Sequence, residues 1–358
     1  MRTPGYLLPM AVVTLAALFR LRHVRSRGGR RLFGEGLLLL IGIIVAAELG
    51  AAILAPTGDP DDHQFFMHLR LLAYGLFGIV PLYLVGVAAI AWRRARWVSV
   101  LAALGAAVVL AVALDAFVIE PRWLDVSRVR VQSAKVDRPL TIVVLADIQT
   151  DQVGAWEKSV LARAMAEQPD LVLLPGDYVH EGGARWQAQA ERLRALLQEM
   201  GRARLGAFAV QGNVEPPGWE AIFDGTGITA SSETTTTELE GVTVTALAFG
   251  ASFDRSLHVP PRGALHIVFG HGPDFALGDV QADLLVAGHT HGGQVQLPFL
   301  GPLVTLSAVP RAWASGVTRL SGGRTLVVSR GIGMERGDAP RLRFLCRPEL
   351  VVIRVEPE

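Results

Sequence analysis

The feature that most constrains this chain is an abrupt change in composition near residue 120. The residues before it contain three long apolar runs, at 33–55, 68–92 and 98–119. Each run is long enough to cross a bilayer, which takes roughly 20 residues in a helix. A fourth apolar segment, 6–19, is shorter, and its basic residues follow it instead of preceding it as in a signal peptide. We expect residues 1–120 to form an α-helical transmembrane region of three or four helices; the alternative for the three long runs is buried helices of a large soluble protein.

Positively charged loops predict the orientation of these spans. Six arginines lie between residues 20 and 31, and Arg93, Arg94 and Arg96 separate the last two spans. Loops rich in arginine and lysine stay on the cytoplasmic side of a membrane. The last span should therefore run outward, which makes this a multi-pass cell-membrane protein with its C-terminal domain outside the cytoplasm.

Overall charge and cysteine content set two further limits. The chain has 34 basic and 33 acidic residues, so its charge balance gives no indication of a nucleic-acid partner. It has a single cysteine, Cys346, which excludes an intrachain disulfide and leaves the redox compartment open. The oligomeric state is likewise left open.

From residue 139 onward the pattern is that of a soluble α/β domain. Short apolar runs rich in β-branched residues predict buried strands, and two longer stretches at 156–167 and 185–200 predict helices. The strands are expected at 140–146, 171–174, 208–210, 265–269 and 284–287. We assign residues 139–358 to this domain and residues 121–138 to a linker.

Each of these five strands is followed within a few residues by side chains of the kinds that bind metals. In chain order they are Asp147 with Gln149, Asp177, Asn213, His271, and His289 with His291. One Gly-Asp or Gly-Asn pair is ordinary turn chemistry, but binding sites in α/β sheets gather beyond the carboxyl ends of strands. Oxygen and imidazole ligands without thiolate suit divalent Mn, Fe or Zn. The ordered set predicts a metal site at this end of the strands.

The same motifs resemble the calcineurin-like metallophosphoesterase superfamily, in particular its bacterial members with an N-terminal membrane region. The resemblance rests on Asp147-x-Gln149, Gly176-Asp177, Gly212-Asn213, Gly270-His271 and the run GHTHGGQ at 288–294. It covers the chain from about residue 139 to the C-terminus. It implies a four-layer α/β/β/α sandwich, following the α-helical transmembrane region.

The resemblance also implies a ligand set and a reaction. Two divalent metal ions would be bridged by the carboxylate of Asp177. The first ion would be held by Asp147, Gln149 and His291, and the second by Asn213, His271 and His289. Asp177, Asn213 and His271 are the implied catalytic residues. The implied activity is hydrolysis of a phosphomonoester or phosphodiester, with a metal-activated water as nucleophile.

Two positions depart from the family pattern. Gln149 stands where the family has histidine, and its neutral carbonyl is a poorer ligand than imidazole for late transition metals. Val214 stands where the family has a histidine assigned to the leaving group, and valine cannot transfer a proton. Glu215 or His180 could substitute for that histidine.

These departures keep a second interpretation open, in which the chain is a metal-binding pseudoenzyme that acts as a membrane-bound binding or regulatory module. We favour the enzyme, because metals supply much of the catalysis without a general acid. A transporter is disfavoured because the spans show no internal repeat and few polar groups. Anchoring favours a phosphoester substrate that is itself lipid-linked, with membrane lipid as a partner.

Overall fold

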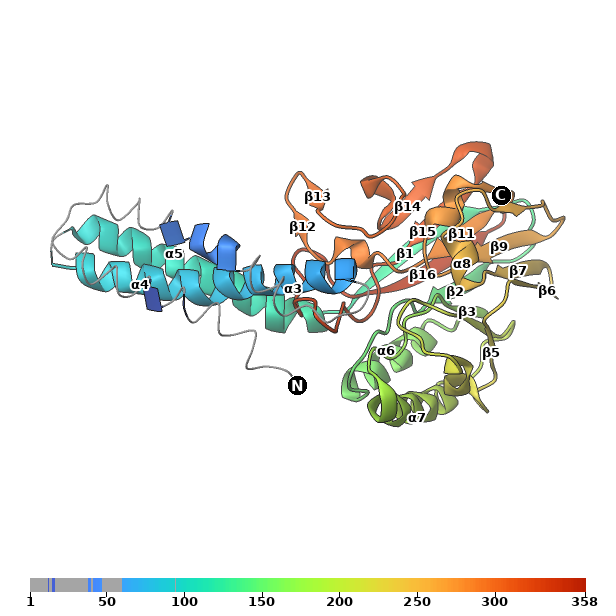
Figure 1. Cartoon of the computed structure of the whole chain (residues 1–358). Helices are drawn as coiled ribbons and strands as arrows, with labels where there is room; N and C mark the ends of the chain where they lie inside the picture. The colour runs from blue at the N-terminus through green and yellow to red at the C-terminus, as the bar shows by residue number, and fades with distance from the viewer. Residues whose placement is uncertain (1–11, 13–14, 17–37, 40, 47–59, 94) are drawn as a thin grey trace. The chain divides into compact units, whose positions relative to one another are not determined.

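The computed structural model describes residues 12, 15–16, 38–39, 41–46, 60–93 and 95–358 (Figure 1). The chain divides into two compact units. One contains residues 1–118 and 338–341, and the other contains residues 119–337 and 342–358.

Two of the described helices are long and apolar enough to cross a membrane, by length and composition alone. The first, Gln64–Ala91, runs through α3 (Pro60–Tyr74), η1 (Gly75–Ile79) and α4 (Val80–Ala91). The second, Arg96–Arg122, runs through α5 (Arg96–Leu114), η2 (Asp115–Ile119) and η3 (Glu120–Arg122). They contain the apolar run expected at 98–119 and all but Trp92 of the run expected at 68–92. Most of the expected segment at 6–19 and most of the run at 33–55 lie outside the described residues.

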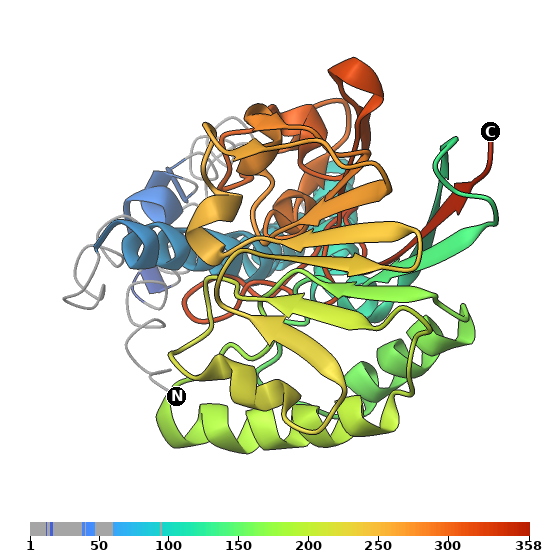
Figure 2. The same cartoon turned by 90° about the vertical axis from the view of Figure 1, so that its right-hand side faces the viewer.

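Two six-stranded mixed sheets form the body of the second unit (Figure 2). The first sheet has the order β1-β16-β2-β3-β4-β5, and the second has the order β14-β15-β11-β9-β7-β6. The first sheet comprises β1 (Asp125–Gln132), β2 (Leu140–Val144), β3 (Leu171–Leu174), β4 (Ala207–Val210), β5 (Ile228–Ser231) and β16 (Glu349–Glu356). The second comprises β6 (Thr235–Leu239), β7 (Val242–Ala246), β9 (Leu265–Phe269), β11 (Leu284–Ala287), β14 (Gly316–Arg319) and β15 (Thr325–Val328). The mixed α/β fold expected from the sequence is confirmed.

The two sheets pack face to face through a shared apolar core. Ile142 and Leu173 of the first sheet are fully buried in one cluster with Ile267 and Val286 of the second. Strands buried on both faces read as continuous apolar runs, as LTIVV of β2 and LLVA of β11 do. This core fixes the distance between the sheets, and therefore the distance between residues that follow their strands.

Helices cover the outer face of each sheet, but unequally. On the first sheet lie α6 (Ala155–Ala166), α7 (Gly183–Glu199) and η4 (Trp219–Phe223), whose buried residues pack with those of β2 and β3 (Figure 2). The second sheet is covered by the much shorter α8 (Phe249–Ser252) and η5 (Asp274–Leu277). The helical layer expected on this second face is thus made of single turns and loops.

Short elements complete the unit: β8 (His258–Val259), β10 (Asp279–Val280), η6 (His291–Gly293), β12 (Gln296–Leu297), β13 (Gly301–Pro302), η7 (Arg311–Trp313) and η8 (Ser321–Gly323). Residues 121–138, which the sequence analysis treats as a linker, contain β1. This strand pairs in parallel with β16 along its whole length, from Asp125 opposite Glu349 to Gln132 opposite Glu356. The segment is therefore part of the first sheet.

Parallel pairing brings the functional strand ends together. In the first sheet β2, β3 and β4 are parallel neighbours, and in the second β9, β11 and β15 are parallel neighbours. Their carboxyl ends lie at one edge of each sheet. The loops that leave those edges carry the residues of the candidate site.

Candidate metal centre

All seven metal-ligand candidates follow strands that end at these two edges. Asp147 and Gln149 follow β2, Asp177 follows β3, and Asn213 follows β4. From the second sheet, His271 follows β9, and His289 and His291 follow β11. The contacts described below connect the seven residues into one continuous group.

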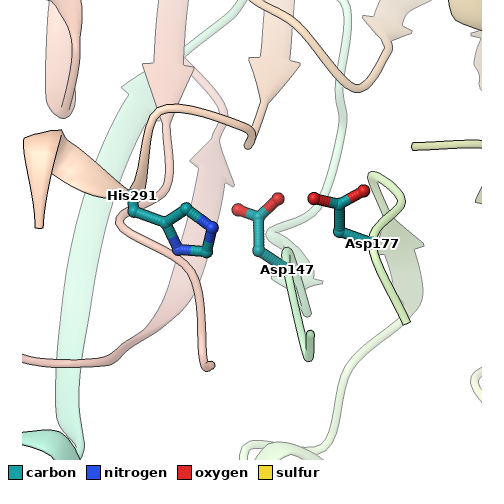
Figure 3. Close-up of side chains that lie close together, drawn as sticks. All are labelled: Asp147, Asp177 and His291. Carbon is teal, nitrogen blue, oxygen red and sulfur yellow. The ribbon is translucent and has the colours of Figure 1, made fainter. Parts of the chain in front are cut away.

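Asp147, Asp177 and His291 form the first cluster of potential ligand atoms. One atom from each of the three lies within 4.8 Å of the others, and all three side chains are buried. In Figure 3 the His291 ring points toward the Asp147 carboxylate, which lies beside that of Asp177. Two carboxylates this close repel each other, so the arrangement requires protons or a cation.

A second cluster contains three atoms that all act as hydrogen-bond acceptors. His271 places Nδ1 2.8 Å from the Pro175 carbonyl and must donate there, which leaves Nε2 with a free lone pair. His289 likewise places Nε2 3.0 Å from the Leu306 carbonyl, which leaves its Nδ1 as an acceptor. These two nitrogens are 3.1 Å apart, and they lie 2.8 and 3.2 Å from Asn213 Oδ1. Three acceptors this close to one another are favourable around a cation.

Asp177 connects the two clusters. Its Oδ1 lies 3.6 Å from His271 Nε2 of the second cluster, while the carboxylate also belongs to the first. The backbone N–H of Val214 donates to the same Oδ1 at 3.1 Å. The carboxylate therefore lies where a ligand shared by two ions would be needed.

Two buried polar atoms of the site, Gln149 Oε1 and His291 Nε2, have no hydrogen-bond partner among the described residues. Arg343 Nη2 comes within 3.4 Å of His291 Nδ1, but it donates more closely to the carbonyls of Arg330 and Gly333, at 2.7 and 2.5 Å. The arginine therefore leaves the imidazole tautomer undetermined. An unpartnered buried polar atom is costly, and a metal ion would satisfy both atoms. The residues present fit a divalent metal.

The backbone is strained at five of the seven candidate ligands. Positive φ angles occur at Asp147 (48°), Gln149 (32°), Asp177 (57°), His289 (69°) and His291 (47°). Half of the ten non-glycine residues with positive φ in the described part of the chain are thus in this group. Such conformations cost of order 1–3 kcal/mol each and persist where the surroundings enforce them, commonly at functional sites.

Glycines in the motifs allow the strand ends to approach each other. A Cβ atom on Gly288 would lie 2.6 Å from Asp147 Oδ2, and one on Gly212 would overlap the Asp177 carboxylate. The absent side chain at Gly288 also lets the following N–H, that of His289, donate to both Asp147 oxygens, at 2.9 and 3.1 Å. The glycines before Asn213 and His289 are therefore needed because any side chain there would collide with the carboxylates of Asp177 and Asp147.

Burial shifts the pKa of each carboxyl and imidazole group among the candidate ligands toward the neutral form. Burial and the charge of Asp177 raise the pKa of Asp147 well above its usual value, and burial raises that of Asp177 to about 7. Burial lowers the pKa of His271 and of His289 to about 4. A divalent cation binds imidazoles in their neutral form and carboxyl groups in their ionised form. Its positive charge would therefore stabilise the ionised state of these buried carboxyl groups.

Two residues next to the motifs have separate roles. The buried carboxylate of Glu215 accepts three backbone N–H bonds, from Asp177, Tyr178 and Gly212, at 3.0, 2.7 and 2.7 Å. This residue holds the loops after β3 and β4 together, so it does not replace the family histidine in proton transfer. His180, the other candidate substitute, places Nδ1 3.2 Å from Gln149 Nε2.

Glu335 is a residue of the site that the sequence analysis missed. It lies in the loop after β15, and its Oε2 accepts a hydrogen bond from Gln149 Nε2 at 3.2 Å. The same oxygen is 4.0 Å from His291 Nε2, and the other oxygen is 3.7 Å from His180 Nδ1. Burial and the charge of Asp177 raise the pKa of Glu335 to about 7. No strand end or motif marks this position, and an acidic residue close after the Arg330-Gly331-Ile332-Gly333 segment was the one available signal.

The raised carboxyl pKa values predict how the stability of the metal-free protein depends on pH. The pKa values of Asp177, Glu335 and Glu215 rise to about 7, 7 and 8, so between about pH 6.5 and 8 the folded state holds protons that the unfolded state has lost. Free energy of unfolding should therefore fall as pH rises, by up to about 1.4 kcal/mol per pH unit for each protonated group. The buried histidines, with lowered pKa values, are neutral in the folded state but partly protonated in the unfolded state near pH 6.5, so they reduce this slope at the lower end of the range and hardly affect it near pH 8.

Chemical unfolding of the metal-free protein at several pH values in this window measures the effect. Added Mn²⁺ should abolish it, because a bound cation stabilises the ionised carboxylates. A metal-free protein whose stability is constant or rises from pH 7 to 8 would show that these carboxyl groups do not hold protons in the folded state.

Comparisons with known proteins agree with this geometry. Residues 140–293 match the model of the calcineurin-like phosphoesterase family. The chain is 29% identical over 260 residues to an uncharacterized metallophosphoesterase, YkuE, of Bacillus subtilis (strain 168), a match that covers 66% of this chain and 87% of the relative. It is 27% identical over 254 residues to the phosphodiesterase YaeI of Escherichia coli (strain K12), covering 66% of this chain and 90% of the relative.

The chain therefore carries a calcineurin-like phosphoesterase domain, and its expected resemblance to the metallophosphoesterase superfamily is confirmed. The protein is a hydrolase that acts on ester bonds.

Proposed function

We propose that the protein hydrolyses a phosphomonoester or phosphodiester with two divalent ions held by the seven candidate ligands. Asp147, Gln149 and His291 would hold the first ion and Asn213, His271 and His289 the second, with Asp177 between them. The observation that supports this most strongly is the trio of acceptor atoms on Asn213, His271 and His289, 2.8 to 3.2 Å apart.

The chain's own residues determine how a phosphoryl group would be handled. Bound in this site, two divalent ions would neutralise the developing charge on the phosphoryl oxygens and activate a water molecule. The carbonyls of Pro175 and Leu306 hold the two imidazoles in the orientation that presents lone pairs to the site. Asp177, Asn213 and His271 are proposed as the catalytic residues, because their polar atoms converge where the two ions would meet.

The substrate would enter beside Val214. This residue lines a cavity of about 330 Å³, together with Glu181, Trp186 and Pro216. Val214 cannot protonate a leaving group, and the carboxylate of Glu215, which also lines this cavity, is held by three backbone N–H groups. The proposed enzyme is therefore expected to favour phosphoesters whose leaving groups depart as stable anions.

Hydrolysis of a phosphoester panel tests this function. The purified full-length chain, supplied with Mn²⁺, Fe²⁺ or Zn²⁺, should release nitrophenol from bis-nitrophenyl phosphate or nitrophenyl phosphate, and chelation should stop the release. The ratio of the two rates decides between diester and monoester hydrolysis. Bound metal without turnover on any ester would instead identify a metal-binding regulatory module.

We further propose that residues 1–120 anchor the hydrolase domain, which contains β1 and residues 139–358, in the cell membrane with the domain outside the cytoplasm. Support comes from the two long apolar helices, Gln64–Ala91 and Arg96–Arg122, and from the arginines before and between the expected spans. A domain at the outer membrane surface would meet lipid-linked phosphoesters, which makes these the proposed substrates.

A C-terminal reporter is expected to be active outside the cytoplasm. Fused after Glu358, alkaline phosphatase should be active in cells and a green fluorescent protein should be dark, since each matures on only one side of the membrane. Replacing Arg93, Arg94 and Arg96 by glutamate should reduce the phosphatase signal by weakening the cytoplasmic retention of that loop. A fluorescent and phosphatase-inactive pair of fusions would contradict the proposed orientation.

A further inference from the structure

The side chain of Glu335 completes the half of the site where the family pattern is broken. Gln149 replaces an imidazole, and a neutral amide oxygen alone binds a transition metal weakly. The Glu335 carboxylate lies within hydrogen-bond distance of this same residue, at 3.2 Å from Gln149 Nε2. Glu335 thus brings a negative charge to the position that lost a ligand.

The distances fit two ligands of one ion. Bonds from oxygen and nitrogen ligands to a transition metal are about 2.0 to 2.2 Å long, so two ligand atoms on one ion lie about 3 to 4.4 Å apart. Glu335 Oε2 and His291 Nε2 are 4.0 Å apart. The space between them would therefore accommodate a single ion.

Unpartnered atoms around this space point to a missing cation. His291 Nε2 and Gln149 Oε1 are buried and have no hydrogen-bond partner among the described residues, although Gln149 Nε2 is engaged by Glu335. Gln149 is fully buried and His291 is 4% exposed. Glu335 thus offers a carboxylate oxygen beside two buried atoms, His291 Nε2 and Gln149 Oε1, that accept no hydrogen bond from the described residues.

We propose that Glu335 is a metal ligand of the first ion, and that it replaces the imidazole missing at position 149. In this arrangement Gln149 holds the Glu335 carboxylate through its amide N–H and presents its own oxygen to the same ion. The first ion then has mainly oxygen ligands from Asp147, Asp177, Gln149 and Glu335, with His291 as the one nitrogen ligand. Oxygen-rich sites favour Mn²⁺ over Zn²⁺. This inference rests on the proposed dimetal site.

Titration of the purified full-length chain with Mn²⁺, with free Mn²⁺ followed by electron paramagnetic resonance, tests the assignment. The wild-type chain should bind two ions. Glu335→Gln should weaken the binding of one ion by about 10- to 100-fold and leave the other unchanged, as loss of a ligand does. Glu233→Gln, the same substitution at an exposed position, is the matched control and should bind both ions normally.

Two further measurements separate a ligand from a merely structural residue. Metal-free Glu335→Gln should unfold at the same or a higher temperature than wild type, because a buried charge near Asp177 has been removed, while the stabilisation by Mn²⁺ should be smaller. Adding Gln149→His to Glu335→Gln should restore binding of the first ion and shift its preference toward Zn²⁺, since an imidazole returns to the site.

The outcomes distinguish this inference from the proposed function. Two ions of normal affinity in Glu335→Gln would overturn the role of Glu335 and leave the dimetal site intact. A lower unfolding temperature of the metal-free variant with unchanged Mn²⁺ affinity would likewise overturn it, in favour of a structural role. A wild-type chain that binds no Mn²⁺ would overturn the dimetal site itself and this assignment with it.

Discussion

Asp177→Asn is expected to remove most of the bound metal and to lower kcat/KM for any phosphoester by about 10³-fold or more. Its carboxylate lies in the Asp147 and His291 cluster and is 3.6 Å from His271 Nε2, so both ions would lose a ligand. Metals contribute several kcal/mol of charge stabilisation, and each 1.36 kcal/mol is worth about tenfold in rate. Elemental analysis and steady-state kinetics on the purified variant measure the two effects.

Controls separate this loss from misfolding and from a general loss of charge. Asp137→Asn makes the same substitution at an exposed position and should retain metal and activity. Gln149→Ala should lose less metal than Asp177→Asn, because it removes a neutral ligand of one ion. Metal-free Asp177→Asn should be at least as stable as wild type, since a buried carboxyl with a pKa raised to about 7 is removed. Equal metal content in the two site variants would contradict the bridging role.

Val214→His is expected to raise activity on alkyl phosphoesters by up to about 10²-fold while changing aryl esters little. A general acid matters most where the departing oxygen is most basic, and such acids contribute typically 10²- to 10⁴-fold. The structure allows the substitution for two reasons. The contact of Val214 with Asp177 is made by its backbone N–H, which a histidine would keep, and the residue lines a cavity of about 330 Å³. The measurement is kcat/KM on one alkyl and one aryl ester at constant metal content.

Val214→Leu is the matched control for this substitution, because it adds volume to the same cavity without a proton. It should leave the ratio of alkyl to aryl rates unchanged. If Val214→His also leaves this ratio unchanged, with metal content constant, then position 214 is not where leaving-group protonation was lost.

The sequence predicts the strand ends of this site well because the physical signals there are local. Buried strands such as LVLL of β3 and LLVA of β11 are apolar on both faces, and a glycine followed by a polar ligand comes within three residues of each strand's end. Parallel strands then necessarily bring their carboxyl ends to one edge. Asp177 and His289 are therefore placed by short-range pattern and by simple topology.

Other features depend on long-range contacts that no local pattern records. Glu335 reaches Gln149 across 186 positions of the chain, from a loop without regular structure. The strand β1 lies in the expected linker, and only its pairing with β16, at the opposite end of the domain, places it in the first sheet. The positive φ angles at Asp147 and His291 likewise have no signal in the local sequence. Tertiary context decides each of these features.

The number of divalent ions bound per chain is the measurement that tests the central claim most directly. The full-length protein, loaded with Mn²⁺ and freed of excess metal, should contain two ions per chain by elemental analysis. One ion would be bound by Asp147, Asp177, His291 and Gln149, and the other by Asn213, His271 and His289. A correctly folded wild-type chain that retains no divalent ion would contradict the account.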